Sequence, residues 1–102
     1  MESHDKDEPL ETRLVQVRGQ VQGVGYREAC VRRARELSVT GWVCNRMDGS
    51  VEAMLQGSPE QLADICAWLS EGMSAALVDA LEITEVPPPF ACFDNFERLP
   101  TL

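Results

Sequence analysis

The sequence has few basic residues and few aromatic residues. Nine Lys and Arg stand against 17 Asp and Glu among 102 residues, which gives a formal net charge of −8. A surface of that sign repels a phosphate backbone, so non-specific nucleic-acid binding is not expected. The two Trp, one Tyr and three Phe do not cluster in the candidate central strands, which also argues against an RNA-binding domain.

Other absences exclude further classes of protein. No apolar run approaches the roughly 18 residues of a membrane span, and the N-terminus lacks the basic-then-apolar order of a signal peptide. We therefore expect a cytoplasmic protein without a membrane partner. The single histidine, His4, and four cysteines without a C-x-x-C pair offer no zinc site and no phosphohistidine route. The thiols are expected to be reduced and separately buried, at Cys30, Cys44, Cys66 and Cys92.

The charge is distributed unevenly along the chain. Residues 12–46 contain seven arginines and two glutamates, so their net charge is positive, whereas the flanking segments 1–11 and 47–102 are both acidic. An anion-binding site is therefore expected in the first half of the chain. Residues 1–11 lack an apolar period and contain Pro9, which predicts a disordered acidic tail before a single domain of residues 12–102.

The apolar pattern predicts two helices and up to five strands. Alternation between turn signals indicates strands, and a spacing near one helical turn indicates helices. In chain order we expect a strand at Leu14–Val17, a helix from Tyr26 to about Ser38, a hairpin of Trp42–Arg46 and Val51–Leu55, a second helix after Ser58, and strands at Leu77–Val86 and about Ala91–Leu99. This order predicts an α+β fold: a ferredoxin-like α/β sandwich, with an antiparallel sheet of four to five strands and both helices on one face.

Two local signals in this pattern are specific. Asp48-Gly49 between two apolar runs predicts a type I′ hairpin turn, which needs positive φ at both central residues. At the second helix, Ser58 is a suitable N-cap, Pro59 suits the first helical position and Gln61 completes a capping box. An apolar stripe then predicts the buried face of this helix, at Leu62, Ile65, Cys66 and Leu69.

Three glycines in the seven residues from Gly19 to Gly25 join the first strand to the first helix. Amides at a helix start lack intrahelical partners, and glycines allow several of them to converge on one anion. Arg27 adds a planar guanidinium that matches phosphate oxygens. The pattern predicts a cradle for a small dianion, with a simple tight connection as the alternative. The spacings of a Walker loop and of a dinucleotide fingerprint are absent, so a nucleotide site is not expected.

Two longer stretches carry a family resemblance. GQVQGVGYR at residues 19–27 resembles the first signature of the acylphosphatase family, and GWVCNRMDGSVE at residues 41–52 resembles the second. The resemblance extends from about Leu14 to Arg98. It implies a ferredoxin-like fold and metal-independent hydrolysis of acyl phosphates to a carboxylate and inorganic phosphate, by a monomeric enzyme without a cofactor.

The resemblance also implies which residues form the site. Arg27 would hold the phosphoryl group and Asn45 would place the attacking water. Backbone amides of the loop would share the phosphoryl group with Arg27, at Gln20, Val21, Gln22, Gly23 and Val24. An acyl phosphate leaves as a weakly basic carboxylate, so positioning and charge stabilisation suffice without a strong general acid. The alternative is a noncatalytic acylphosphatase-like module that binds a phosphorylated metabolite or a protein partner.

Overall fold

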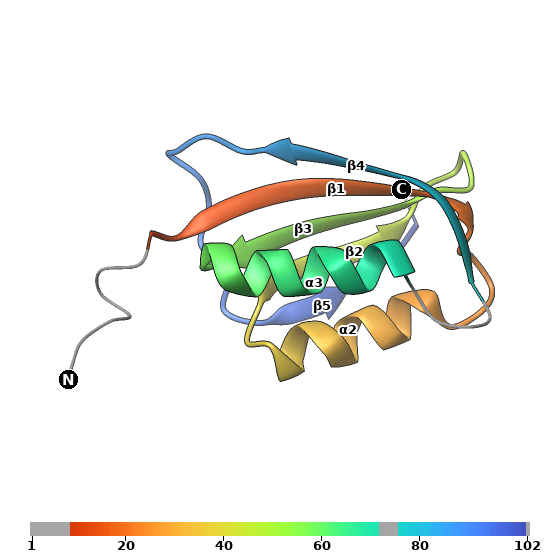
Figure 1. Ribbon diagram of the computed structural model, residues 1–102, viewed down its shortest axis with the longest axis horizontal. Helices are drawn as coiled ribbons and strands as arrows, with labels where there is room; N and C mark the ends of the chain where they lie inside the picture. The colour runs from red at the N-terminus through yellow and green to blue at the C-terminus, as the bar shows by residue number, and fades with distance from the viewer. Residues whose placement is uncertain (1–8, 72–75, 102) are drawn as a thin grey trace.

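The computed structural model describes residues 9–71 and 76–101, which form one five-stranded sheet with two helices on one face (Figure 1). The elements are β1 (Glu11–Gln20), α2 (Tyr26–Glu36), β2 (Thr40–Asn45), β3 (Val51–Gly57), α3 (Pro59–Glu71), β4 (Leu77–Glu85) and β5 (Phe96–Arg98). The strand order is β4-β1-β3-β2-β5. The ferredoxin-like α+β fold predicted from the sequence is confirmed. Most of the expected tail, residues 1–8, lies outside the described residues, and β1 begins at Glu11.

The sheet is mixed, and only its last strand departs from the predicted antiparallel arrangement. β1 pairs antiparallel with β3 and β4, and β2 pairs antiparallel with β3, whereas β5 pairs parallel with β2. After β4 the chain crosses the end of the sheet where β1 and β2 begin, so β5 starts at the same end as β2. The Gln56 side chain holds this crossing, because it donates to the carbonyl of Ala91 (2.7 Å) and accepts from the amide of Phe93 (3.1 Å). The crossing uses residues that the sequence had assigned to a strand, which leaves only three residues in β5.

The core lies between the helices and one face of the sheet. Alternate strand residues such as Val15, Val17 and Leu55 are fully buried there. The predicted stripe of α3 is confirmed, because its four residues are all buried. Tyr26 at the start of α2 joins the two helices: its hydroxyl donates to the carbonyl of Leu69 at 2.7 Å, and its ring stacks on Trp68.

The start of α3 has the capping box that the sequence predicted. The Ser58 hydroxyl accepts from the amide of Gln61 at 3.2 Å, and the Gln61 side chain accepts from the amide of Ser58 at 2.8 Å. The Gln61 amide group also donates to the carbonyl of Leu37 at 3.0 Å, beyond the end of α2. The capping residues therefore connect the two helices as well as starting one of them.

Three local predictions were wrong in detail. α2 ends at Glu36, and Ser38 already has a left-handed φ of 61°. The turn between β2 and β3 is not type I′, because Gly49 has a positive φ (96°) but Asp48 does not. The Asp48 carboxylate instead accepts from the amide and hydroxyl of Ser50, so a longer loop joins the strands. Cys92 is exposed, whereas the other three cysteines are buried as expected.

Candidate active site

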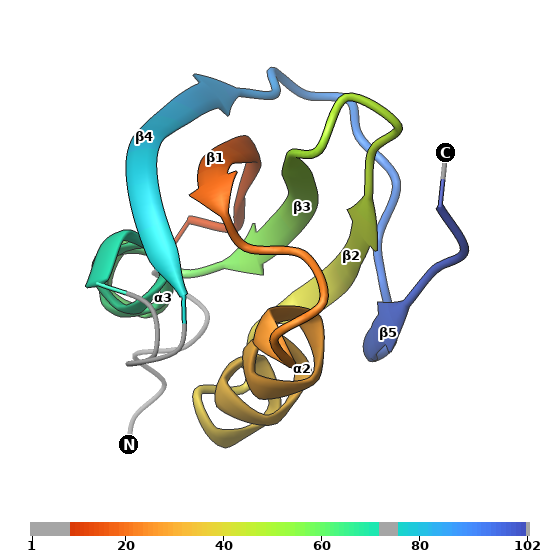
Figure 2. The same ribbon diagram turned by 90° about the vertical axis from the view of Figure 1, so that its right-hand side faces the viewer.

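The glycine loop, residues 19–25, lies at the end of the sheet where β1 ends and α2 begins (Figure 2). The register of β1 against β4 shifts at Gly19, where φ is 135° and a Cβ would overlap the carbonyl oxygen of Leu77. Gly25 is the N-cap of α2 in a left-handed conformation (φ 83°) and provides no side-chain cap. The shape of the glycine loop therefore depends on residues without a Cβ.

The predicted phosphate-binding residues occupy different environments within this loop. Val21 is 1% exposed and anchors the loop in the core, and Val24 packs against the core. Gln20 and Gly23 are exposed, and Gln22 is half-buried. Within the described ranges 9–71 and 76–101, the backbone amides of residues 21–24 have no hydrogen-bond acceptor. These amides precede the positive end of the α2 dipole, so they are available to an anion.

Asn45 is the last residue of β2 and is 9% exposed. It pairs with Val51 and lies two residues after Val43, and both valines face the helices in the core. The Asn45 side chain therefore lies on the same side of the sheet as α2. Its Oδ1 atom is buried and has no hydrogen-bond partner among the described residues. An unsatisfied buried acceptor costs about 1–3 kcal/mol, so a bound donor would stabilise it.

Arg27, in the first turn of α2, lines a cavity of about 390 Å³ together with residues 98–101. The positive charge of Arg27 acts on Cys44, the residue before Asn45 in β2. Burial, and then the Glu52 carboxylate, raise the pKa of the Cys44 thiol, while Arg46 and Arg27 lower it. Arg27 therefore lies close enough to the end of β2 for its charge to act on Cys44.

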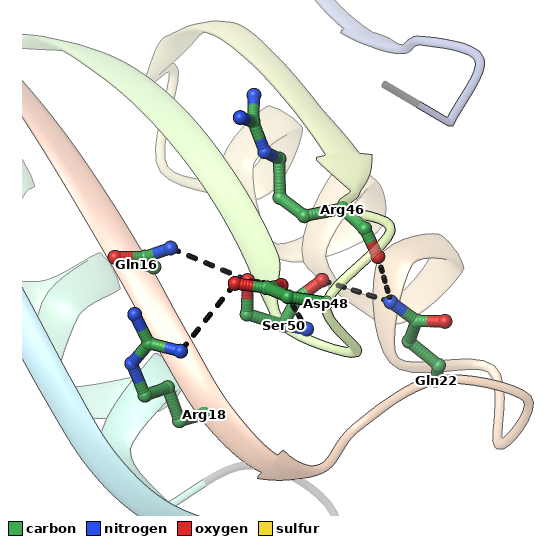
Figure 3. Close-up of polar contacts among 6 residues, drawn as sticks. All are labelled: Gln16, Arg18, Gln22, Arg46, Asp48 and Ser50. Atoms are coloured by element: carbon green, nitrogen blue, oxygen red, sulfur yellow. Dashed lines mark hydrogen bonds and ion pairs between the residues drawn. The ribbon is translucent and has the colours of Figure 1, made fainter.

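The hairpin loop, residues 46–50, connects the glycine loop to Asn45 (Figure 3). The Gln22 side chain donates from Nε2 to the carbonyls of Arg46 (2.8 Å) and Ser50 (2.9 Å). On the other side of the hairpin loop, Arg18 lies 3.5 Å from the Asp48 carboxylate. Hydrogen bonds from Ser50, assisted by Arg18, hold the pKa of Asp48 below its usual range. These contacts connect the hairpin loop to Arg18 near the end of β1 and to Gln22 in the middle of the glycine loop.

The sequence did not predict the role of the Gln22 side chain. Its backbone amide was predicted to bind phosphate, but its side chain acts as a brace to residues 24 and 28 positions further along the chain. The local sequence pattern does not reveal contacts at that separation, because a glutamine that braces a distant loop and a solvent-exposed glutamine occur in the same kind of loop sequence.

Most arginines of the basic segment are paired with acids. Arg46 lies 3.1 Å from Glu52, and Arg13 lies 3.8 Å from Glu85. Among residues 9–71 and 76–101, no ion pair involves Arg27. The arginines outside α2 are therefore neutralised by nearby acids and, among the described residues, the unpaired positive charge of the basic segment lies on α2.

The remaining features of the described residues concern metal-ligand clusters, membrane-spanning helices and other cavities. Nowhere in residues 9–71 and 76–101 do three His, Cys, Asp or Glu side chains gather in a way that could hold a metal ion. No helix in these ranges is long and apolar enough to cross a membrane. A second cavity, of about 420 Å³, lies at the opposite end of the sheet beside Leu10 and Thr12, away from the glycine loop.

The fold and the site define a ferredoxin-like α+β protein whose first loop has several backbone amides without an acceptor among the described residues. The Acylphosphatase family model matches residues 14–97 of the chain. The chain belongs to the acylphosphatase family, whose members are enzymes that hydrolyse acyl phosphates.

The relatives cover nearly the whole chain. Acylphosphatase 1 of Ralstonia nicotianae is 73% identical over 93 residues, which are 91% of each chain. An acylphosphatase of Polaromonas naphthalenivorans is 58% identical over 96% of this chain and 97% of its own. The solved structure of an acylphosphatase from Coxiella burnetii superimposes with a TM-score of 0.85 at 30% identity, over 96% of this chain and 100% of its own.

Proposed function

We propose that this acylphosphatase cleaves the carboxyl-phosphate bond by in-line attack of a water that Asn45 positions, on a phosphoryl group held by Arg27 and the amides of the glycine loop. The observation that carries the proposal is the buried Oδ1 of Asn45, which has no hydrogen-bond partner among the described residues. A carboxamide oxygen accepts a hydrogen bond from water, and its orientation directs the water's lone pair.

The phosphoryl group is held by donors that need no rearrangement. The amides of residues 21–24, which have no acceptor among the described residues, and the Arg27 guanidinium supply hydrogen bonds and positive charge to the equatorial oxygens. Charge on these oxygens changes as the bond to the acyl oxygen breaks, and fixed donors stabilise it. The Gln22 brace keeps the glycine loop and the end of β2 together, so the water and phosphorus are held in line.

The reaction balances without a general acid from the protein. Water oxygen forms a bond to phosphorus, the bond from phosphorus to the acyl oxygen breaks, and the acyl group leaves as a carboxylate. The proton of the water passes to an oxygen of the phosphate product. Asn45 is an amide and does not take this proton near neutral pH, so its role is to position the water.

We further infer that the enzyme needs no metal ion, acts as a monomer and works in the cytoplasm. The support for a reducing compartment is that Cys30, Cys44 and Cys66 are buried and unpaired and that the exposed Cys92 is also free. Size-exclusion chromatography with light scattering tests the oligomeric state.

Benzoyl phosphate hydrolysis by the purified protein, with and without a chelator, tests the mechanism. We expect turnover that the chelator does not change. Arg27→Ala should weaken inhibition by inorganic phosphate about tenfold or more, because a charged hydrogen-bonding group is lost. Asn45→Ala should lower kcat by about a hundredfold with a smaller effect on phosphate inhibition.

Matched controls are Arg32→Ala, an exposed arginine on the same helix, and Asn95→Ala, an exposed asparagine outside the site. Both should keep the activity of the parent protein. Absence of hydrolysis by the folded parent, or hydrolysis undiminished in both Arg27→Ala and Asn45→Ala, contradicts the mechanism.

A further inference from the structure

The cavity beside Arg27 has a second arginine in its wall. Apart from Arg27, its lining residues all come from the C-terminal segment: Arg98, Leu99, Pro100 and Thr101. It is a largely open depression in the surface, with a volume of about 390 Å³. None of the four residues belongs to the two sequence stretches that identify the family.

The parallel pairing of β5 brings this segment to the site. Arg98 lies opposite Val43 in the register, and the amide of Leu99 donates to the Val43 carbonyl at 2.8 Å. Because β5 runs parallel to β2, the chain beyond Leu99 continues toward the end of β2 that carries Asn45. Figure 2 shows β5 beside both β2 and α2.

Arg98 already binds a carboxylate at this position. Its Nη1 lies 3.0 Å from Oε1 of Glu28, one residue after Arg27 in the first turn of α2. The two side chains are 49% and 58% exposed. An ion pair this exposed contributes at most about 1 kcal/mol, so another carboxylate can replace Glu28. A guanidinium has five N–H donors, and one oxygen contact leaves others available to the cavity.

We propose that Arg98 is a specificity-determining residue that favours acyl phosphates whose acyl group carries a second carboxylate. The inference rests on the proposed function: with the phosphoryl group on Arg27, the acyl group extends into the rest of the cavity. Leu99 and Pro100 then contact its carbon skeleton, and Arg98 binds the distal carboxylate in place of Glu28. The substrates of this class are monophosphates of dicarboxylic acids.

The test compares rigid substrates that carry or lack a second carboxylate at the same ring position. Benzoyl phosphates with a carboxylate at ring position 3 or 4 are compared with the corresponding methylbenzoyl phosphates, because at these positions the ring keeps the second carboxylate from attacking the acyl carbon and expelling phosphate without the enzyme. We expect the parent protein to have a higher kcat/KM for at least one carboxylate isomer than for its methyl counterpart. Arg98→Gln should lower this preference about fivefold, the effect of one half-exposed ion pair.

Three controls separate this effect from others. Unsubstituted benzoyl phosphate should keep its kcat/KM in Arg98→Gln, which excludes damage to the fold or to the phosphoryl site. Arg32→Gln makes the same change in net charge on the exposed surface of α2 and should keep the preference. Glu28→Gln removes the competing carboxylate and should raise the preference. Increasing ionic strength from about 0.05 to 0.5 M should reduce it, because exposed charges are screened.

The outcomes distinguish the two proposals. If the parent protein hydrolyses benzoyl phosphate but has no preference for either carboxylate isomer, or if Arg98→Gln leaves the preference intact, the role of Arg98 is overturned and the catalytic mechanism stands. If the folded parent protein hydrolyses no acyl phosphate, the proposed function itself fails.

Discussion

The Gln22 side chain connects the glycine loop to the hairpin loop that follows Asn45. Its side-chain amide donates to two carbonyls of the hairpin loop, and those carbonyls belong to residues 46 and 50. Asn45 directly precedes this loop, and the glycine loop contains Gln22 itself. In the proposed mechanism this half-buried side chain therefore controls the distance between the phosphoryl group and the attacking water, to which phosphoryl transfer is sensitive.

We predict that Gln22→Ala lowers kcat about tenfold, because the glycine loop loses both anchors to the hairpin loop. Steady-state kinetics with benzoyl phosphate measures this effect. Gln61→Ala is the control: it also removes two side-chain hydrogen bonds, but at the start of α3, remote from the site. It should lower the unfolding free energy and keep kcat. Equal kcat losses in both variants would contradict a positioning role for Gln22.

At the scale of the element, α3 shows how sequence-local chemistry fixes a helix start. The Ser58 hydroxyl and the Gln61 side chain satisfy each other's backbone amides, and Pro59 occupies the first helical position, where no amide is needed. α2 is different: Gly25 gives it no side-chain cap, so its first amides stay available. The start of α3 is therefore capped by side chains, whereas the start of α2 has no side-chain cap.

Removal of the α3 cap should cost stability without affecting catalysis. We predict that Ser58→Ala lowers the unfolding free energy by about 1 kcal/mol, the typical value of an N-cap side chain. For a domain of this size the corresponding fall in Tm is about 4–8 °C, measured by circular dichroism. Ser58→Asp retains an acceptor at the cap and should keep most of the stability. A Ser58→Ala protein with unchanged Tm would show that the capping box contributes nothing measurable.

At the scale of the whole molecule, burial of ionisable groups couples stability to pH. Cys30 lies in the core between α2 and the sheet, and burial raises the pKa of its thiol from 9.0 to about 12. Burial, followed by the proximity of Cys30, also raises the pKa of Tyr26. Both groups keep their protons in the folded protein at pH values where the unfolded chain loses them.

Stability should therefore be complete below about pH 9 and fall as the pH rises toward 12. In that window the unfolded state binds fewer protons than the folded state, so each added pH unit favours unfolding by up to about 1.4 kcal/mol for this one thiol. Urea unfolding at several alkaline pH values measures the slope. Cys30→Ala, although less stable overall, should show a shallower slope, and an equal slope would exclude Cys30 as the source.

The sequence predicted the elements where the signals are local. The stripe of α3, its capping box and the order of strands and helices all follow from side-chain spacing and from the chemistry of single residues. The position of the hairpin was predicted correctly, but its turn type was wrong. The Asp48 backbone does not adopt a positive φ, and the Asp48 carboxylate accepts a hydrogen bond from the amide of Ser50. The predicted length of the last strand was too great, because Gln56, 35 residues earlier, donates a hydrogen bond to the Ala91 carbonyl and holds this residue in the crossing segment before β5.

The sequence by itself therefore determined the fold class, the family and the positions of the glycine loop, Arg27 and Asn45, because each depends on residue type and spacing along one short stretch. Only the tertiary structure decided which charges remain available, since Arg13, Arg18 and Arg46 are paired with acids from later strands and turns. It also decided that Gln22 braces the site and that Arg98 lies beside Arg27. Such long-range contacts depend on strand register and on the parallel pairing of β5, which no local pattern specifies.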